Sequence, residues 1–351
     1  MTTAKEIDGA RYSGSGTIVR QAVALAALTG TDIRITNVRC KRPKPGLRQQ
    51  HTSVVEAIRG LVNGKVEGNH VGSSTLFFQP GREAVRESYT WDIGSAGSTV
   101  LLAEALLPLL AFHRHEATIQ VRGGIFQDFA PSFYHLKFSL LPLLRQMGLP
   151  AEARMLRPGY VPVGDGVIEL DIGRVDAPLK PLVLNDRGDI QRIWGIALAS
   201  RLKERKVAQR MAGAARDFMY QQGMTDQIDE VDEETAAQPG AAFAIFADTA
   251  GGATLGSDRS GSPRRMAEAV GRHAARVLLE DLATGASVDR FTADQLIPFA
   301  ALAEGESRWS VPRITDHIEA GAWLAKELLG AEVLVSEDGV TVRGVGFMPR
   351  H

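Results

Sequence analysis

The residues with the most evident chemistry form one basic loop, residues 39–48, with the sequence RCKRPKPGLR. It carries five arginines and lysines, no acidic residue, and two prolines that keep the backbone extended. Guanidinium groups held in this way suit phosphate, which arginine binds through two parallel hydrogen bonds. A phosphate site and a solvated basic turn are both compatible with the pattern. Cys40 has no recognisable base beside it, so we expect inert packing rather than a nucleophile.

Two other loops carry groups that could take part in chemistry. The segment Ile314-Thr315-Asp316-His317 precedes an amphipathic stretch, which places His317 in the first turn of a predicted helix. There the helix dipole lowers the pKa of an imidazole and keeps the ring neutral, hence nucleophilic, although a histidine at such a position is more often a capping or structural residue. The segment 123–132 has two glycines and ends in Ala130-Pro131-Ser132, which can cap the helix that follows.

These three loops occupy the same place in a repeat of helix, strand, helix, strand and strand. The first copy comprises a helix at 17–28, strands at 33–38, near Val66 and at 75–78, and a helix at 51–62. The second comprises a helix from Thr99, a helix at 132–147, and strands at 117–123, near Met155 and at 167–172. The third comprises a helix from Thr292, a helix at 316–329, and strands at 307–314, 333–336 and 340–345. The pattern predicts an α/β (α+β) fold of three repeated units around a common axis.

The segment between the second and third copies does not follow the sequence pattern of the repeat. Strands are expected at the apolar runs PLVL and AAFAIFA, and helices are expected at 196–222 and 263–279. The acidic stretch 226–234 is expected to be a solvated loop. We therefore predict a core domain of residues 1–181 and 280–351, interrupted by a smaller inserted α/β domain of residues 182–279.

Composition narrows the function classes. The 351 residues are 44% hydrophobic and 23% charged with a net charge of −1, which excludes a globally basic nucleic-acid coat. A single cysteine excludes intramolecular disulfides and zinc sites of the CxxC type. The N-terminus has no signal-peptide pattern, and the longest apolar run, 100–112, is too short to cross a bilayer. A cytoplasmic protein is expected, and no Walker phosphate loop is present, so any ATP needs another kind of pocket.

Several segments resemble the RNA 3′-terminal phosphate cyclase family. They are IDGARYSGSGTIVRQAVALAALTG at 7–30, NVRCKRPKPGLRQQH at 37–51, EGNHVGSSTLFFQPG at 67–81, DIGSAGSTVLL at 92–102, APS at 130–132, RPGYVPVGDG at 157–166, FTADQL at 291–296 and ITDH at 314–317. The resemblance spans nearly the whole chain in order, including the place and size of the insert. It implies the core of three repeats with one inserted domain.

The resemblance also implies an activity: ATP-dependent conversion of an RNA 3′-phosphate to a 2′,3′-cyclic phosphodiester. AMP would be carried first on a histidine and then on the RNA phosphate before the 2′-hydroxyl expels it. ATP and a divalent cation, Mg²⁺ or Mn²⁺, would be required. The partner would be a single-stranded RNA 3′ end bearing a phosphate, no membrane would be involved, and a homodimer stays open.

The resemblance assigns site residues by position. His317 matches the nucleophile. Contacts to phosphate and the RNA terminus are implied for Arg20, Arg39, Arg42, Gln50 and His51. Contacts to ATP are implied for Glu104, Pro131, Phe291, Asp294 and Gln295. As an alternative to nucleotide binding, Asp294 and Gln295 could simply cap their helix and Phe291 could belong to the hydrophobic core.

Three departures mark a divergent member. Ser13 stands where the family has a glutamate associated with metal and nucleotide, the segment PVGDG at 162–166 where the family has PxGGG, and His135 where an aromatic or apolar residue is common. Glu104 also stands where glutamine is common. Two other functions therefore stay open: a non-catalytic, cyclase-like RNA-binding factor, and an adenylyltransferase acting on another phosphorylated end. The presence of His317 argues against the non-catalytic RNA-binding factor, whereas Ser13 argues for it.

Overall fold

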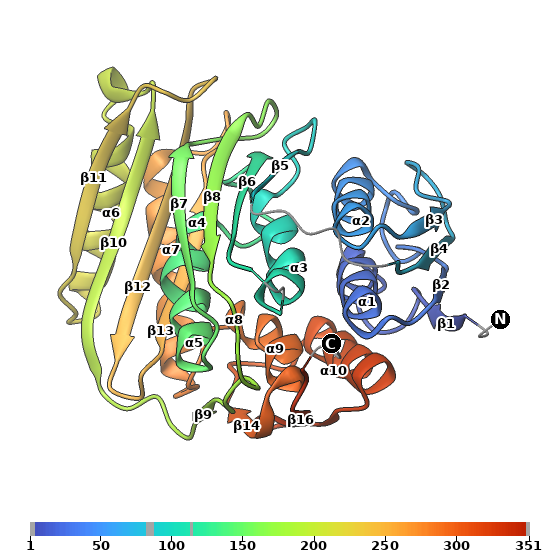
Figure 1. The fold of residues 1–351 in the computed structure, drawn as a ribbon. Coiled ribbons are helices and arrows are strands. Elements are labelled where there is room, and N and C mark those ends of the chain that lie inside the picture. Colours follow the sequence, from blue (N-terminus) through green and yellow to red (C-terminus); the bar gives the residue numbers. More distant parts are fainter. Residues whose placement is uncertain (1–3, 82–87, 113–114, 349–351) are drawn as a thin grey trace.

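The computed structural model describes residues 4–81, 88–112 and 115–348, and it contains three units of the same topology (Figure 1). Each unit has a four-stranded sheet in which the first two strands are parallel and the last two join in antiparallel fashion. The first unit comprises β1 (Lys5–Asp8), α1 (Gly16–Thr29), β2 (Ile33–Thr36), α2 (Gln49–Leu61), β3 (Lys65–Glu67) and β4 (Leu76–Gln79).

The other two units repeat this order with small variations. The second comprises β5 (Ser88–Asp92), α3 (Thr99–Ala111), β6 (Ala117–Gly123), α4 (Phe133–His135), the π-helical turn η1 (Leu136–Leu140), α5 (Leu141–Gln146), β7 (Ala151–Arg157) and β8 (Gly166–Ile172). The third comprises β9 (Val183–Leu184), α8 (Thr292–Gln295), α9 (Ile297–Leu302), β14 (Glu304–Trp309), α10 (Asp316–Leu329), β15 (Glu332–Ser336) and β16 (Gly339–Val345). The predicted α/β class with three repeats is confirmed.

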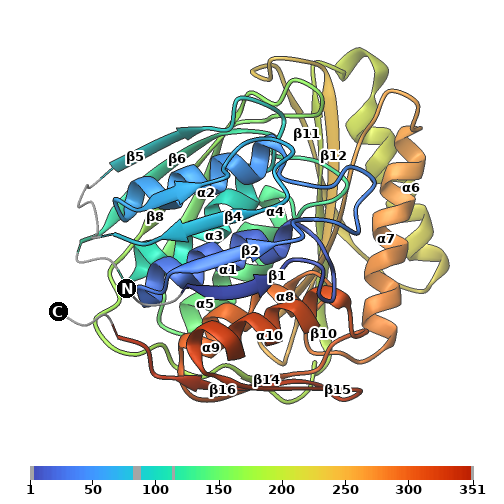
Figure 2. The same cartoon turned by 90° about the vertical axis from the view of Figure 1, so that its right-hand side faces the viewer.

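The helices of the units pack against one another, with the sheets on the outside (Figure 2). Helix α1 contacts α2, α3 and α10, because its AVALAAL segment is apolar on most sides and almost wholly buried. Ser15 caps α1 at its start, and Gly30 ends it in a left-handed conformation. Within the described residues, no helix is long and apolar enough to cross a bilayer.

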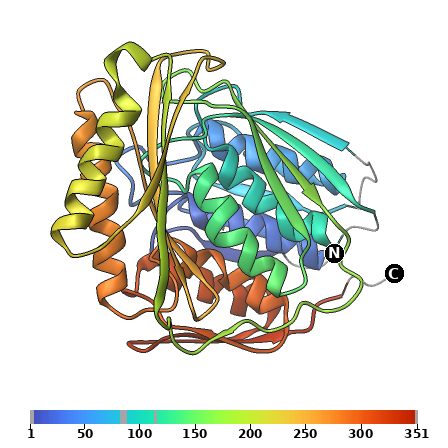
Figure 3. The same ribbon diagram turned by 90° about the vertical axis from the view of Figure 1, so that its left-hand side faces the viewer.

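A fourth sheet lies within residues 190–260, in the strand order β11-β10-β12-β13. Its elements and helices are β10 (Ile190–Ser200), η2 (Lys203–Arg205), α6 (Val207–Gln221), β11 (Gln227–Glu233), β12 (Gly240–Thr249), β13 (Thr254–Ser260) and α7 (Ala267–Ala283). Figure 3 shows α6 and α7 covering one face of this sheet. The other face meets the second unit, where Phe138 packs edge-on against Trp194 and Phe246.

Several sequence predictions are corrected here. The first two units each have an additional first strand, which is only four or five residues long and therefore carries little periodic signal. The first strand of the third unit, β9, lies within the predicted PLVL strand, which was expected to belong to the insert. The acidic stretch 226–234 is not a loop: residues 227–233 form β11, an edge strand parallel to β10 whose charged side chains face solvent. Residues 196–200, predicted as helix, belong to β10. The strand predicted at 307–314 ends at Trp309, just before Pro312, which has no N–H to donate.

The division into core and inserted domain stays a prediction, and the strand pairing bears on its limits. Strand β9 pairs with β14 of the third unit, although residues 183–184 were assigned to the insert. Helix α7 continues to Ala283, beyond the predicted limit at residue 279. The pairing therefore favours an insert that begins after Leu184 and ends near Ala283.

Candidate active site

Strand topology explains why the chemically active loops converge. In the first unit Asp8 pairs with Thr36 at the ends of the parallel strands β1 and β2. Loops 9–15 and 37–48 therefore leave the sheet at the same edge (Figure 2). Ligands of open α/β sheets bind at the carboxyl ends of the strands because such loops gather there.

His317 is placed by the start of α10. The side chain of Thr315 accepts a hydrogen bond from the backbone N–H of Ile318 at 3.3 Å and caps the helix. The Nδ1 atom of His317 lies 3.0 Å from Oγ1 of Thr17, in the first turn of α1. Arg20 donates from Nη2 to the same oxygen at 3.3 Å. Thr17 was not among the predicted site residues, yet it joins His317 to Arg20.

The electrostatic surroundings keep His317 neutral. Burial lowers its pKa below the ordinary value of 6.5, and the positive charges of Arg20 and Arg42 lower it further. Asp316 acts in the opposite direction with a smaller effect. A neutral imidazole retains a lone pair, so His317 has the protonation state that a nucleophile needs near neutral pH.

The basic loop faces this histidine with charges that have no carboxylate partner. Arg39 donates to the carbonyl oxygens of Lys44 and Gly46 at 2.9 and 2.7 Å, which fixes the loop around its own side chain. Burial and the charges of Arg42 and Arg48 lower the pKa of Arg39. Among the described residues, no ion pair involves a lysine or arginine of this loop. Cations that repel one another without a counterion form a site for an anion.

His51 has a structural position beside this loop. It is 2% exposed, and its Nδ1 atom accepts a hydrogen bond from the backbone N–H of Arg48 at 3.1 Å. Burial, together with the charges of Arg20 and Arg39, lowers its pKa to about 3. Its Nε2 atom lies 2.0 Å from where a Cβ on Gly16 would stand, so the ring packs directly on the start of α1. His51 is therefore a neutral residue that holds α1 and α2 together.

Two carboxyl groups interact electrostatically with Arg20. Burial raises the pKa of Glu104 to about 8 and that of Asp294 to about 7, against the opposing charge of Arg20. Oε1 of Glu104 is buried without a hydrogen-bond partner in the described part of the chain. The buried Oε1 atom of Gln295 likewise has no partner there. Unpartnered buried oxygens mark a place where a ligand or cation can bind.

Phe291 is held beside these carboxyls by a buried pair that sequence reasoning missed. His135 is 1% exposed and its ring lies edge-on to Phe291 at 5.8 Å. Its Nε2 atom is 3.1 Å from Oδ1 of Asp289, which is fully buried. Asp289 also accepts a hydrogen bond from the backbone N–H of Phe291 at 2.9 Å. The unusual histidine at position 135 was a signal, but nothing local connects it to Asp289.

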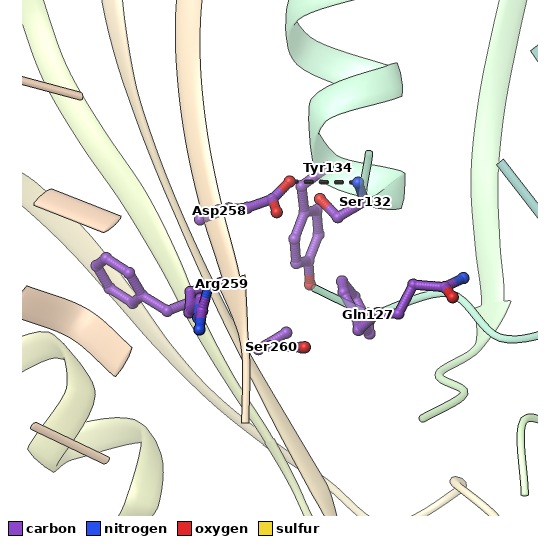
Figure 4. A pocket seen from close by; sticks show the side chains of 10 residues that line it. Gln127, Ser132, Tyr134, Asp258, Arg259 and Ser260 are labelled. Carbon is purple, nitrogen blue, oxygen red and sulfur yellow. Dashed lines mark hydrogen bonds between the residues drawn. The ribbon is translucent and has the colours of Figure 1, made fainter. Parts of the chain in front are cut away.

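Pro131 lies on the loop that meets the inserted sheet. Figure 4 shows Asp258 of β13 reaching the backbone N–H of Ser132, which donates to it at 3.2 Å. Burial raises the pKa of Asp258, and His135 opposes that shift. Strand β13 thus fixes the backbone next to Pro131. A small pocket at this junction is lined by residues of both parts, among them Gln127, Tyr134, Arg259 and Ser260 (Figure 4).

Most of the predicted site residues thus form one connected group, and a few lie at the edge of that group. Hydrogen bonds or electrostatic coupling link His317, Arg20, Arg39, Arg42, His51, Glu104 and Asp294. Phe291 joins through His135. Gln50 instead lies against Gly97, whose Cβ would stand 2.8 Å from that of Gln50. Ser13 is nearly buried and its hydroxyl lies 3.0 Å from that of Ser15.

Three repeated α/β units, a neutral histidine at a helix start and unpaired arginines are the features of an enzyme that handles phosphorylated substrates. The sequence pattern of the RNA 3′-terminal phosphate cyclase family matches residues 11–335. The chain belongs to this family.

Relatives that match this chain over nearly its whole length belong to the same family. RNA 3′-terminal phosphate cyclase of Hyperthermus butylicus is 38% identical, with 98% of this chain and 99% of the relative covered. That of Thermococcus onnurineus is 39% identical, with 97% and 98% covered, and that of Methylococcus capsulatus is 35% identical, with 96% and 95% covered. The solved enolpyruvyl transferase NikO from Streptomyces tendae covers 99% of this chain and 49% of its own at 12% identity, with a TM-score of 0.42. A TM-score this low does not establish a shared fold.

Proposed function

We propose that this protein is an ATP-dependent RNA 3′-phosphate cyclase that works through an adenylyl-histidine intermediate on His317. The observation that carries the proposal is the position of His317, which is kept neutral between Arg20 and Arg42 and hydrogen-bonded to Thr17. Family membership supports the general reaction, and the residues around His317 support this route.

The hydrogen bond to Thr17 supports Nε2 of His317 as the attacking atom. Oγ1 of Thr17 accepts from Arg20, so it can accept from Nδ1–H of His317 as well. With its proton on Nδ1, the ring presents the lone pair of Nε2. That nitrogen attacks the α-phosphorus of ATP; a P–N bond forms, the bond to the bridging oxygen breaks, and pyrophosphate leaves. Arg20 and Arg42 stabilise the negative charge that develops on the phosphate.

The second half of the reaction needs a site for the RNA 3′-phosphate. The basic loop offers Arg39, Arg42 and their neighbours, and none of its lysines or arginines forms an ion pair within the described part of the chain. The RNA phosphate oxygen attacks the AMP on His317 and releases the histidine. The adjacent 2′-hydroxyl then attacks the RNA phosphorus and expels AMP, which closes the 2′,3′-cyclic phosphodiester. Gln50, which is half-buried, follows this loop on the RNA side of the site, whereas the buried His51 supports the loop from beneath and does not reach the RNA.

The nucleotide would lie toward Glu104, Asp294 and Phe291. Phe291 is partly exposed and would supply an aromatic face for the adenine, and Pro131 and Gln295 are the further residues expected to contact the nucleotide. A divalent cation, Mg²⁺ or Mn²⁺, would offset charge on the triphosphate. Among the described residues no group of three or more side chains forms a ready metal site. Mg²⁺ is commonly held by one or two carboxylates plus substrate phosphates, and Glu104 and Asp294 fit that role.

Two further expectations belong to this proposal. The enzyme is expected to act in the cytoplasm on single-stranded RNA, and a homodimer stays an alternative to a monomer. The alternative of a non-catalytic RNA-binding function rests on Ser13, because no carboxylate stands at that position. The two functions differ in turnover, which gives the test.

The test is conversion of an RNA with a labelled 3′-phosphate to the cyclic, phosphatase-resistant form, with ATP and Mg²⁺ or Mn²⁺ present. Wild type and Cys40→Ala, a control at an exposed cysteine of the basic loop, are expected to convert it. His317→Asn keeps a hydrogen-bonding group but no nucleophile, and is expected to be inactive. RNA binding without conversion by wild type under these conditions would establish the non-catalytic function instead.

A further inference from the structure

Tyr12 has a backbone conformation that its side chain disfavours. Its φ angle is +44°, in the left-handed region that bulky residues rarely adopt. Such strain persists only where the surrounding structure enforces it, and it clusters at functional sites. The side chain is 39% exposed, so burial of the ring does not account for the conformation.

Neighbouring residues hold Tyr12 in place from two sides. Its carbonyl oxygen accepts a hydrogen bond from Nζ of Lys41 at 2.8 Å, which ties loop 9–15 to the basic loop. Its ring centroid lies 6.1 Å from that of Trp323 with the planes tilted by 47°. The guanidinium of Arg11 lies 5.0 Å from the centre of the same indole ring. The tyrosine ring thus lies against Trp323 while its side chain stays 39% exposed.

This arrangement places an aromatic ring beside the anion site. Trp323 is on α10, six residues after His317, which is about 9 Å along the helix axis. Tyr12 is five residues before Thr17, the partner of His317. Lys41 and Arg11 add positive charge, and the nearby acid, Asp8, is engaged by Asn37 and by the backbone N–H of Ala10. Positive charge together with an exposed aromatic ring is the combination that binds single-stranded nucleic acid.

We propose that Tyr12 stacks on the nucleobase of the 3′-terminal nucleotide while the basic loop holds that nucleotide's phosphate. This inference rests on the proposed function, because it takes an RNA 3′ end as the occupant of the basic loop. Stacking uses the face that every base possesses, so Tyr12 positions the end without selecting its sequence. The ring orients the terminal ribose toward His317.

Two variants separate the ring from the backbone conformation. Tyr12→Phe keeps the ring, whereas Tyr12→Asn removes it but tolerates the left-handed conformation. The KM of each protein is measured with two RNAs ending in a 3′-phosphate: one intact, and one whose terminal nucleotide lacks its base. Tyr12→Asn is expected to raise the KM for intact RNA roughly 5- to 150-fold and to leave the KM for the abasic RNA unchanged. Tyr12→Phe is expected to resemble wild type with both.

Two results would overturn the inference: an unchanged KM for intact RNA in Tyr12→Asn, or an equal rise for both RNAs. The second would show that the tyrosine only shapes the loop that holds the phosphate. Attachment of AMP to the three proteins without RNA reports on the proposed function separately. If AMP is attached and the two RNAs do not differ, the stacking role is wrong and the enzyme assignment stands. If wild type takes no AMP and converts no RNA, both are wrong.

Discussion

Replacement of Asp289 by asparagine tests how the inserted sheet and the nucleotide side of the site are joined. The carboxylate accepts hydrogen bonds from the backbone N–H groups of Gly256, Phe291 and Thr292, at 3.0, 2.9 and 2.8 Å. It also accepts one from the Thr292 hydroxyl at 2.9 Å and contacts Nε2 of His135 at 3.1 Å. Asparagine keeps the shape, but its NH₂ group would face donors.

The expected loss is about 3 kcal/mol in the free energy of unfolding near pH 6. At least one buried donor loses its acceptor, which costs about 1–3 kcal/mol, and the charged partner of His135 disappears. Burial lowers the pKa of His135, but the charge of Asp289 and its hydrogen bond outweigh burial and raise it above 6.5. A raised histidine pKa stabilises the fold fully below 6.5, and this contribution is lost as the pH rises through the folded-state value.

The difference between wild type and Asp289→Asn should therefore be largest near pH 6 and smaller at pH 9. Urea unfolding at both pH values, followed by tryptophan fluorescence and circular dichroism, measures it. The variants His135→Phe and His135→Phe/Asp289→Asn complete a double-mutant cycle. In the His135→Phe background, Asp289→Asn should lower the free energy of unfolding by less than it does in wild type. A loss below about 1 kcal/mol, or an equal loss with and without His135, would refute the reasoning.

Three further outcomes are expected. Gly16→Ala places a methyl group against the His51 ring and should lower the free energy of unfolding by about 1–3 kcal/mol. Gly60→Ala is the control, because the space around its Cβ is open and the protein should keep its stability. Equal urea midpoints for the two variants would contradict this prediction. Glu104→Gln should stabilise the protein at pH 7, by a margin that grows from pH 4.5 to about 8, since burial raises that carboxyl's pKa; a margin independent of pH would contradict it. Arg42→Ala should weaken binding of 3′-phosphorylated RNA more than of 3′-hydroxyl RNA, as measured by fluorescence anisotropy; equal weakening would show contact with backbone phosphates only.

The repeated units could be predicted because each repeats a strong local pattern. Helix α10 begins at Asp316 and ends at Leu329, as expected from its apolar spacing and the glycine that follows. The inserted sheet was harder to predict. The apolar run at 196–200 fits a buried strand as well as a helix, and pairing with β12 decides between them. The acidic residues of β11 are tolerated in a strand because they lie on an exposed edge.

Single site residues could be predicted from loop position, but their partners could not. Thr17 and His317 are 300 positions apart in the chain, and His135 and Asp289 are 154 apart. No local periodicity relates residues at such separations, because packing of different units brings them together. The same holds for the neutral state of His51, which follows from its burial against Gly16.

The central claim is that His317 carries AMP during the reaction. The most direct measurement is intact-protein mass spectrometry after incubation with ATP and Mg²⁺ or Mn²⁺, without RNA. Wild type is expected to gain the mass of one AMP, to lose it on brief acid treatment as a histidine phosphoramidate does, and to retain it in alkali. His317→Ala is expected to gain nothing, while His51→Ala still takes up AMP. An unmodified wild type with either metal, or an AMP adduct that persists in His317→Ala, would contradict the account.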